Sequence, residues 1–245
     1  MFCFAIIFCI LLARNLSKEA LVEDMHLLNK PLSYSIIVDA ESIIVKNATI
    51  VLEDNTNVYY LEAKSLPKTK YRGNLLYLHG AAYSSHDWNR NKPSILQLSA
   101  AAGYRTIAID LPGFGYSRTQ SSVSFNKSAF MSSVIRNLNI HRPIIISPSA
   151  SGSYAIPYVL KNADRIGGFI PVAPCCVHNT GWEQFTVPTL VVYGSDDKAS
   201  ISAELLKIPN RKLVIIPNAP HAAYIRKPID FITALINFLD SINSS

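Results

Sequence analysis

Three residues have the types and the chain order that nucleophilic catalysis needs: Ser149, Asp197 and His221. A serine hydroxyl is a weak nucleophile until a nearby base takes its proton, and histidine is the usual base. The histidine in turn needs a carboxylate that holds its ring in the right orientation. We therefore predict a unit for acyl transfer, with Ser149 as nucleophile, His221 as base and Asp197 as the orienting acid.

Ser149 lies where a β-branched run meets small residues, in the segment PIIISPSASGS at 143–153. A nucleophile on a sharp strand-to-helix turn needs small neighbours two places away, usually as G-x-S-x-G, and here Ser147 and Ser151 replace the glycines. Ser151 is the rival nucleophile, but the strand length favours Ser149. A helix opening at Ala150 would direct that backbone N–H at a developing oxyanion. Taken alone, the motif fits a simple helix cap equally well.

The acid and base candidates follow two later apolar runs. TLVVYG ends at Gly194, and an acid three residues after this glycine is Asp197, with Asp196 as the rival. His221 is the only histidine after the last run, KLVIIP. Each residue alone also fits a surface aspartate or a loop histidine, but together they favour catalysis.

Two further loops follow predicted strands. His79, Gly80 and Ala81 come after NLLYL, and the backbone N–H of Ala81 is the candidate for a second oxyanion donor. His79 is interpreted as a structural loop residue. The D-x-P-G-x-G-x-S turn at 110–117 needs its glycines for backbone angles, and we expect it to shape the site without taking part in catalysis.

The elements that must position these residues alternate along the chain from residue 74. Short apolar runs predict strands buried on both faces, and the segments between them predict helices at 92–102, 125–138, 152–162, 200–207 and 228–241. This alternation predicts an α/β fold with a mostly parallel, doubly wound sheet and helices on both faces. Segments 33–40, 42–52 and 57–63 predict antiparallel strands before it. We expect a single domain over residues 31–245.

The predicted strands GFIPVAP and TLVVYG are separated by a segment too short for a cap domain. Only the 13 residues 175–187 lie between Pro174 and Pro188, which leaves room for one short helix. The site should therefore be shallow. Trp182 and Phe185 in this segment either line an acyl pocket or pin the short helix to the core, and the two alternatives are equally weighted.

The N-terminal segment 2–13, FCFAIIFCILLA, is apolar and uncharged. It is shorter than the roughly 20 residues that span a bilayer as a helix. Its length fits a signal peptide, with residues 1–13 forming the signal peptide or a signal anchor; a buried helix is the alternative. A glycosylation sequon at Asn47 agrees with a secretory location, either secreted or membrane-associated through this segment, and a cytoplasmic location is the alternative.

Charge and cysteine content argue against several functional classes. The net charge of +6 comes from scattered basic residues, with no dense stripe for nucleic acid. The four cysteines include no CxxC pair, so no metal site is expected. GFGYS at 113–117 is not a full GxGxxG, so no cofactor is expected. The adjacent Cys175 and Cys176 are poorly suited to an unstrained disulfide, and we interpret them as small residues at a strand end.

Several stretches together resemble the abhydrolase-domain-containing 14 family of α/β-hydrolases: LLYLHG, AAGYRTIAIDLPGFGYS, IIISPSASGSYAIPY, VPTLVVYGSDD and NAPHAAYIRKP. The resemblance covers roughly residues 47–240. The unusual S-P-S-x-S-G elbow points to this family, and the apolar N-terminus is more similar to its membrane-associated A branch.

The resemblance implies a serine hydrolase that removes small acyl groups from an ester or an acylated protein, including deacetylation of acyl-lysine. It assigns the triad to Ser149, Asp197 and His221. Pro220 stands where the family usually has glycine, and proline fixes φ near −65°. This departure keeps a second hypothesis open, in which the chain is a catalytically silent hydrolase-fold protein that binds a partner.

Overall fold

The computed structural model of the chain describes residues 24–117, 126–197 and 201–243. The apolar N-terminal segment lies outside the described residues.

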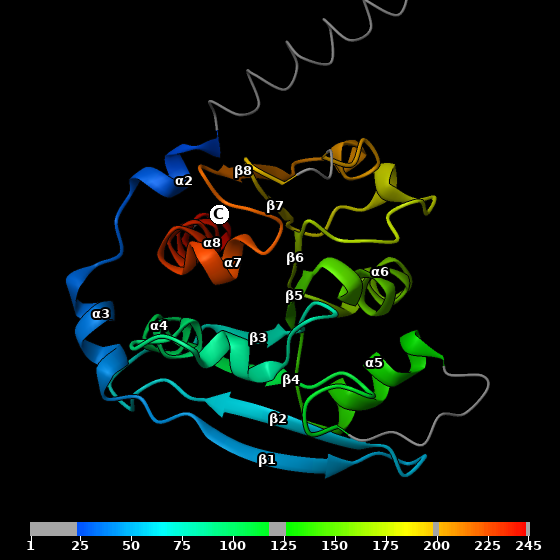
Figure 1. The fold of residues 1–245 in the computed structure, drawn as a ribbon, viewed down its shortest axis with the longest axis horizontal. Coiled ribbons are helices and arrows are strands. Elements are labelled where there is room, and N and C mark those ends of the chain that lie inside the picture. Colours follow the sequence, from blue (N-terminus) through cyan, green and yellow to red (C-terminus); the bar gives the residue numbers. More distant parts are fainter. Residues whose placement is uncertain (1–23, 118–125, 198–200, 244–245) are drawn as a thin grey trace, which may run out of the picture.

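One sheet of eight strands forms the centre of the molecule, in the order β1-β2-β4-β3-β5-β6-β7-β8 (Figure 1). Strands β1 and β2 pair antiparallel, as do β2 and β4, and every other neighbouring pair is parallel. The predicted α/β fold with antiparallel N-terminal strands is confirmed. The strands are β1 Lys46–Val51, β2 Asn57–Ala63, β3 Gly73–Tyr77, β4 Tyr104–Ile109, β5 Ile144–Pro148, β6 Gly168–Val172, β7 Leu190–Gly194 and β8 Lys212–Ile216.

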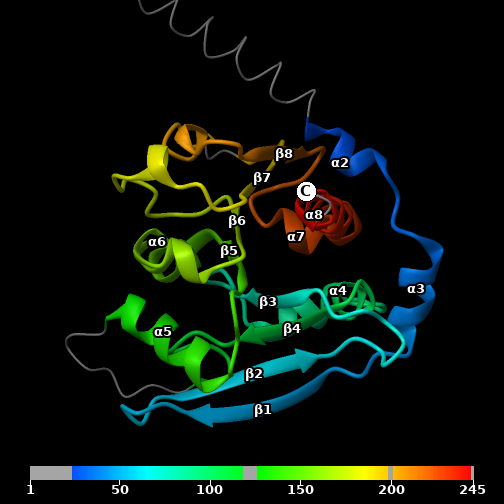
Figure 2. The same ribbon diagram turned by 180° about the vertical axis from the view of Figure 1, so that it is seen from behind.

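Helices cover both faces of this sheet, because side chains of the parallel strands are apolar on both sides. The helices are α2 His26–Asn29, α3 Tyr34–Glu41, α4 Ile95–Ala101, α5 Lys127–Asn137, α6 Gly152–Lys161, α7 Ala223–Arg226 and α8 Pro228–Asn243. Figures 1 and 2 show α4, α7 and α8 on one face and α5 and α6 on the other. Each face has its own apolar core, so successive strand residues point into alternate cores.

The predicted strand at 33–40 is wrong, since these residues form helix α3. The Ser33 side chain caps the helix by accepting a hydrogen bond from the Ile36 N–H, and Ala40 is fully buried. Local capping and packing against α4 therefore outweigh the β-propensity of the Ile-Ile-Val run. The N-terminal antiparallel unit has two strands, β1 and β2, instead of three. Within the described part of predicted helix 200–207, only a 3₁₀ turn at Leu205–Lys207 forms.

Residues ahead of the expected domain start at residue 31 also pack on the body of the molecule. The Asp24 carboxylate accepts a hydrogen bond from the Leu213 N–H at 2.7 Å. The Asn237 side chain donates to the carbonyl oxygens of Leu27 and Lys30, at 2.8 and 2.7 Å. The folded unit therefore includes α2. Among the described residues, no helix combines the length and the apolar character that crossing a membrane requires.

The connection between β6 and β7, residues 173–189, contains a single 3₁₀ turn at Trp182–Gln184 and no inserted domain. Within the described residues, the carboxyl ends of β5, β7 and β8 therefore lie at an edge of the sheet without a cap domain over it. Ligands of open α/β sheets bind at this edge.

Candidate active site

Ser149 follows β5 directly and adopts a left-handed backbone conformation, with φ +50°. Non-glycine residues rarely adopt this conformation, and such strain is concentrated at functional sites. Ser149 opens a 3₁₀ turn that ends at Ser151, and α6 continues from Gly152. The α-helix begins at Gly152, as the predicted range 152–162 has it, and Ala150 belongs to the 3₁₀ turn ahead of it. The sharp strand-to-helix turn lies at the predicted position.

Ser151, the rival nucleophile, is fully buried. Its hydroxyl donates to the Pro148 carbonyl at 2.7 Å and lies 3.1 Å from the Ser147 hydroxyl. The two serines in the usual glycine positions thus bond to each other beneath the turn. Their side chains fill the space that glycines leave open, and Ser149 alone of the three reaches His221.

The three predicted residues meet in one hydrogen-bonded row. His221 Nε2 lies 2.9 Å from Ser149 Oγ, and His221 Nδ1 lies 2.8 Å from Asp197 Oδ2. A carboxylate only accepts, so Nδ1 carries the proton and Nε2 is the acceptor for the serine hydroxyl. The Asp197 side chain is 5% exposed and that of His221 is 48% exposed. The Asp197 carboxylate is therefore protected from water, while the His221 ring faces the solvent.

The rival acid, Asp196, has other partners. It accepts a hydrogen bond from the Ser195 hydroxyl at 2.8 Å, and its N–H donates to the Ala219 carbonyl. The loop before His221 passes so close to β7 that a Cβ on Gly194 would lie 2.1 Å from the Ala219 oxygen. Pro220 lies in this loop, and His221 next to it still bonds to Ser149 and to Asp197.

The loop after β3 borders the nucleophile, as the oxyanion prediction requires. A Cβ placed on Gly80 would lie 3.4 Å from Ser149 Cβ, so this backbone passes beside the serine. Ala81 follows at the exposed surface, and Ala150 is the second residue of the 3₁₀ turn. Both predicted donors are therefore next to residues that surround Ser149.

His79 is buried and ties this loop to the next one. Its Nε2 accepts from the Leu111 N–H at 2.9 Å, so Nδ1 carries the proton and donates to the Gly80 carbonyl at 2.8 Å. Burial lowers the pKa of His79, so the ring stays neutral and keeps this arrangement near pH 7. These contacts agree with a structural role.

The turn at 110–117 is organised by Asp110, which is fully buried. Its carboxylate accepts from the N–H groups of Ser85 and Tyr116, at 2.6 and 2.8 Å. Gly115 has φ +52°, and a Cβ there would lie 2.0 Å from Asp110 Oδ2. The glycine requirement predicted for this turn thus comes from close approach to the aspartate as well as from φ.

Trp182 and Phe185 lie in the core, at 0% and 3% exposure. Trp182 stacks parallel to Phe169 and donates from Nε1 to the Val177 carbonyl at 2.9 Å. This placement favours the alternative in which the two rings pin the β6–β7 connection to the core, over an acyl-pocket role.

Two residues near the site, Cys175 and Tyr224, have contacts there that the sequence did not predict. The N–H of Cys175 donates to the Ser149 carbonyl at 2.9 Å. Tyr224, three residues after His221, is buried against Trp88, with ring centroids 4.3 Å apart. Its hydroxyl lies beside the Gly80 backbone. The doubled cysteine and the aromatic residue three places after the base were the available sequence signals.

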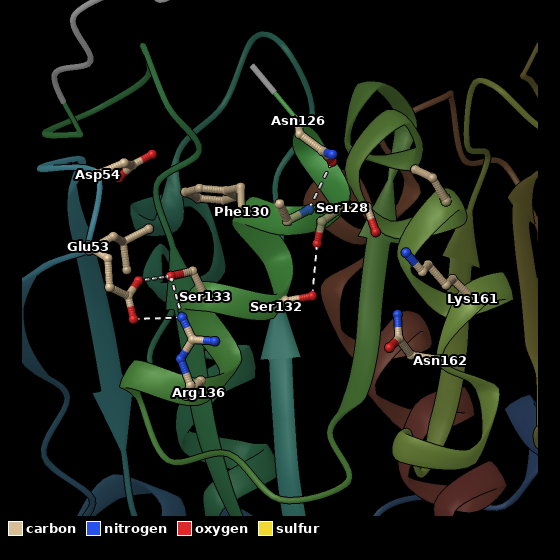
Figure 3. Close-up of a pocket in the computed structure, with 13 residues that line it drawn as sticks. Glu53, Asp54, Asn126, Ser128, Phe130, Ser132, Ser133, Arg136, Lys161 and Asn162 are labelled. Carbon is tan, nitrogen blue, oxygen red and sulfur yellow. Dashed lines mark hydrogen bonds and ion pairs between the residues drawn. The ribbon is translucent and has the colours of Figure 1, made fainter. Parts of the chain in front are cut away.

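A separate recess lies between the β1–β2 turn and helices α5 and α6 (Figure 3), with a volume of about 780 Å³. Glu53 bonds there to Ser133 and to Arg136. None of the triad residues lines this recess, and it is not part of the candidate active site.

The sheet order and the strand-to-helix turn at Ser149 define the class: this is an α/β-hydrolase, and residues 73–180 match the family described as alpha/beta hydrolase fold. A crystal structure of a "predicted CIB-like hydrolase" from Thermoplasma acidophilum has the same fold, with a TM-score of 0.72 at 24% identity over 81% of this chain and 99% of that one.

Within this class, the chain belongs to the ABHD14 family. It is 37% identical to protein ABHD14A of Rattus norvegicus over 196 residues, 77% of this chain and 80% of that protein. It is 36% identical to the Homo sapiens protein named "Putative protein-lysine deacylase ABHD14B" over 180 residues, 70% of this chain and 85% of that protein. The chain is therefore a hydrolase by family and fold.

Proposed function

We propose that the chain is a serine hydrolase that removes short acyl groups from esters and from acylated lysine side chains. The observation that supports this most directly is the row of hydrogen bonds from Ser149 through His221 to Asp197. The strained conformation of Ser149 adds to it, because strain of this kind is maintained where it serves a function.

In the proposed reaction, His221 Nε2 takes the proton of Ser149 as Oγ attacks the carbonyl carbon of the acyl group. The backbone N–H groups of Ala81 and Ala150 stabilise the negative oxygen that forms. Collapse of this intermediate expels the alcohol or amine, which takes the proton from His221. Water activated by the same histidine then releases the acid from Ser149.

The substrate class rests on two observations. The name of the ABHD14B relative includes protein-lysine deacylase, and the candidate site has no cap, with a base that is 48% exposed. An uncovered site admits a large leaving group such as a lysine on a protein surface. It provides little apolar wall for a long acyl chain.

A fluorophosphonate probe tests the proposal, since only an activated serine reacts with it. Wild type should be labelled and Ser149→Ala should not, with a loss of esterase kcat on the order of 10⁶. Ser151→Ala is the matched control and should still be labelled. A folded wild type that is not labelled by the probe would contradict the proposal. It would favour the partner-binding hypothesis, which rests on Pro220 standing where the family usually has glycine.

A further inference from the structure

Two thiols lie side by side at the active-site edge of the sheet. Cys175 and Cys176 follow β6, both are exposed, and both are free. Their sulfur atoms are 2.8 Å apart, and either thiol can donate a hydrogen bond to the other. A pair of this kind is suited to reactions that engage both thiols at once.

The backbone of Cys175 packs directly on the turn that holds the nucleophile. Its N–H donates to the Ser149 carbonyl at 2.9 Å, and its sulfur lies 3.6 Å from the Ala150 carbonyl. Its own carbonyl oxygen approaches Gly152 so closely that a Cβ there would lie 2.4 Å away. Cys175 thus contacts the nucleophile, an oxyanion candidate and the start of α6.

We propose that Cys175 and Cys176 form a thiol-modification site, at which a small-molecule disulfide converts the pair to an intramolecular disulfide and thereby displaces the turn at Ser149. The formation of the disulfide is independent of the catalytic activity. Its effect on turnover rests on the serine hydrolase function proposed above.

The exchange is balanced as two steps. The thiolate of one cysteine attacks a sulfur of the reagent and releases one reagent thiol, and the second cysteine attacks the mixed disulfide and releases the other. The two protein sulfurs lose two electrons and two protons in total, and the reagent disulfide is reduced to two thiols. Partial desolvation, and then the contact with Cys176, raise the pKa of Cys175 to about 11, so we assign Cys175 to the second step.

Ring closure has to change the backbone around this pair. Consecutive Cα atoms are about 3.8 Å apart across a trans peptide, whereas disulfides usually join Cα atoms about 4.4–6.8 Å apart. Cys176 already has φ +64°, a backbone conformation that is uncommon for residues other than glycine. The bonds around the 175–176 peptide must therefore rotate on closure. The N–H that holds the Ser149 carbonyl lies on the other side of the Cys175 Cα, in the 174–175 peptide, so rotation about the backbone bonds of Cys175 displaces this donor. The same strain makes the disulfide easy to reduce.

The test treats the full chain with glutathione disulfide and then reverses the reaction with dithiothreitol. Trypsin cuts after Arg165 and Lys198, so both thiols lie in one peptide, 166–198. We expect this peptide to lose two hydrogen atoms without added glutathione. Fluorophosphonate labelling should fall by about tenfold or more, since a nucleophile misplaced by 1 Å costs on the order of 10²-fold, and dithiothreitol should restore it.

The control is the double variant Cys175→Ser/Cys176→Ser, which retains Cys3 and Cys9 and should label equally in both conditions. Hydrogen exchange over segment 144–161 reports on the turn without catalysis, and it should become faster on oxidation of wild type only. A peptide that stays reduced or carries glutathione overturns the proposal. So does a closed disulfide that leaves hydrogen exchange unchanged. Wild type that never labels, but closes the disulfide with faster exchange, contradicts the hydrolase function alone.

Discussion

At the scale of single residues, neighbouring side chains of the same type have different partners. Asp197 accepts a hydrogen bond from His221 Nδ1, whereas Asp196 accepts from the Ser195 hydroxyl. The Ser149 hydroxyl lies 2.9 Å from His221 Nε2, whereas Ser151 is buried beneath the turn. One or two positions along the chain thus separate a group that bonds to His221 from one that does not.

Asp197→Asn should lower kcat by about 10⁴, because an amide next to Nδ1 favours the wrong histidine tautomer. Asp196→Asn, which leaves the row intact, should keep kcat within about threefold, since no contact with His221 is lost. Hydrolysis of p-nitrophenyl acetate measures both. Equal losses in two folded variants would show that the acid is misassigned.

Ser151→Ala should lower the free energy of unfolding by about 1–3 kcal/mol, because the buried Pro148 carbonyl loses its donor. Urea denaturation followed by circular dichroism measures the change. Ser132→Ala is the control: its hydroxyl bonds to the Ser128 carbonyl on partly exposed α5, so we expect less than about 0.5 kcal/mol. A cost for Ser151→Ala no larger than that of the control would contradict the buried-bond argument.

At the scale of elements, loops after different strands are joined by buried polar side chains. His79, after β3, bonds to the loop after β4, and Asp110, after β4, bonds to Ser85. These contacts fix the Gly80–Ala81 backbone relative to Ser149. The way in which the free energy of unfolding changes with pH should therefore depend on His79, which joins these two loops.

Burial lowers the folded-state pKa of His79. At pH values between this lowered pKa and the ordinary one, the unfolded chain is therefore protonated at His79 while the folded chain is not. The contribution of His79 to stability is complete above the ordinary histidine pKa, about 6.5, and is lost as pH falls from there through the lowered folded-state value. His79→Asn should therefore show a shallower fall in the free energy of unfolding between about pH 7 and 5. Denaturation series at several pH values measure this, and parallel curves would refute it.

At the scale of the whole molecule, the sheet ends at an edge with no cap domain. Burial of an acyl chain gives roughly 0.8 kcal/mol per CH₂, and an open edge offers little burial. We expect kcat/KM to be highest for acetyl or butyryl esters and to fall with longer chains. An ester-length series tests this, and activity that rises steadily to palmitoyl would contradict it.

The secretory location stays a prediction from the apolar segment 2–13, which lies outside the described residues, and from the sequon at Asn47. Asn47 is exposed on the edge strand β1, so a glycan there meets no packed neighbour. Expression in a secretory cell should give a glycosidase-sensitive mass shift that decreases in Asn47→Gln. An unshifted product would rule out this prediction.

The sequence by itself determined the alternation of strands and helices, the missing cap and the three triad candidates. These follow from local patterns, since strands buried on both faces are apolar throughout and turns need small residues. The sequence misassigned α3, because a capped helix packed on α4 overrides the β-propensity of its isoleucines and valine.

Only the tertiary structure decided which of Asp196 and Asp197 meets His221, that Trp182 lies in the core, and that Cys175 contacts the nucleophile turn. Each of these depends on contacts between residues far apart in the chain. Such contacts form only when strands distant in sequence become neighbours in the sheet.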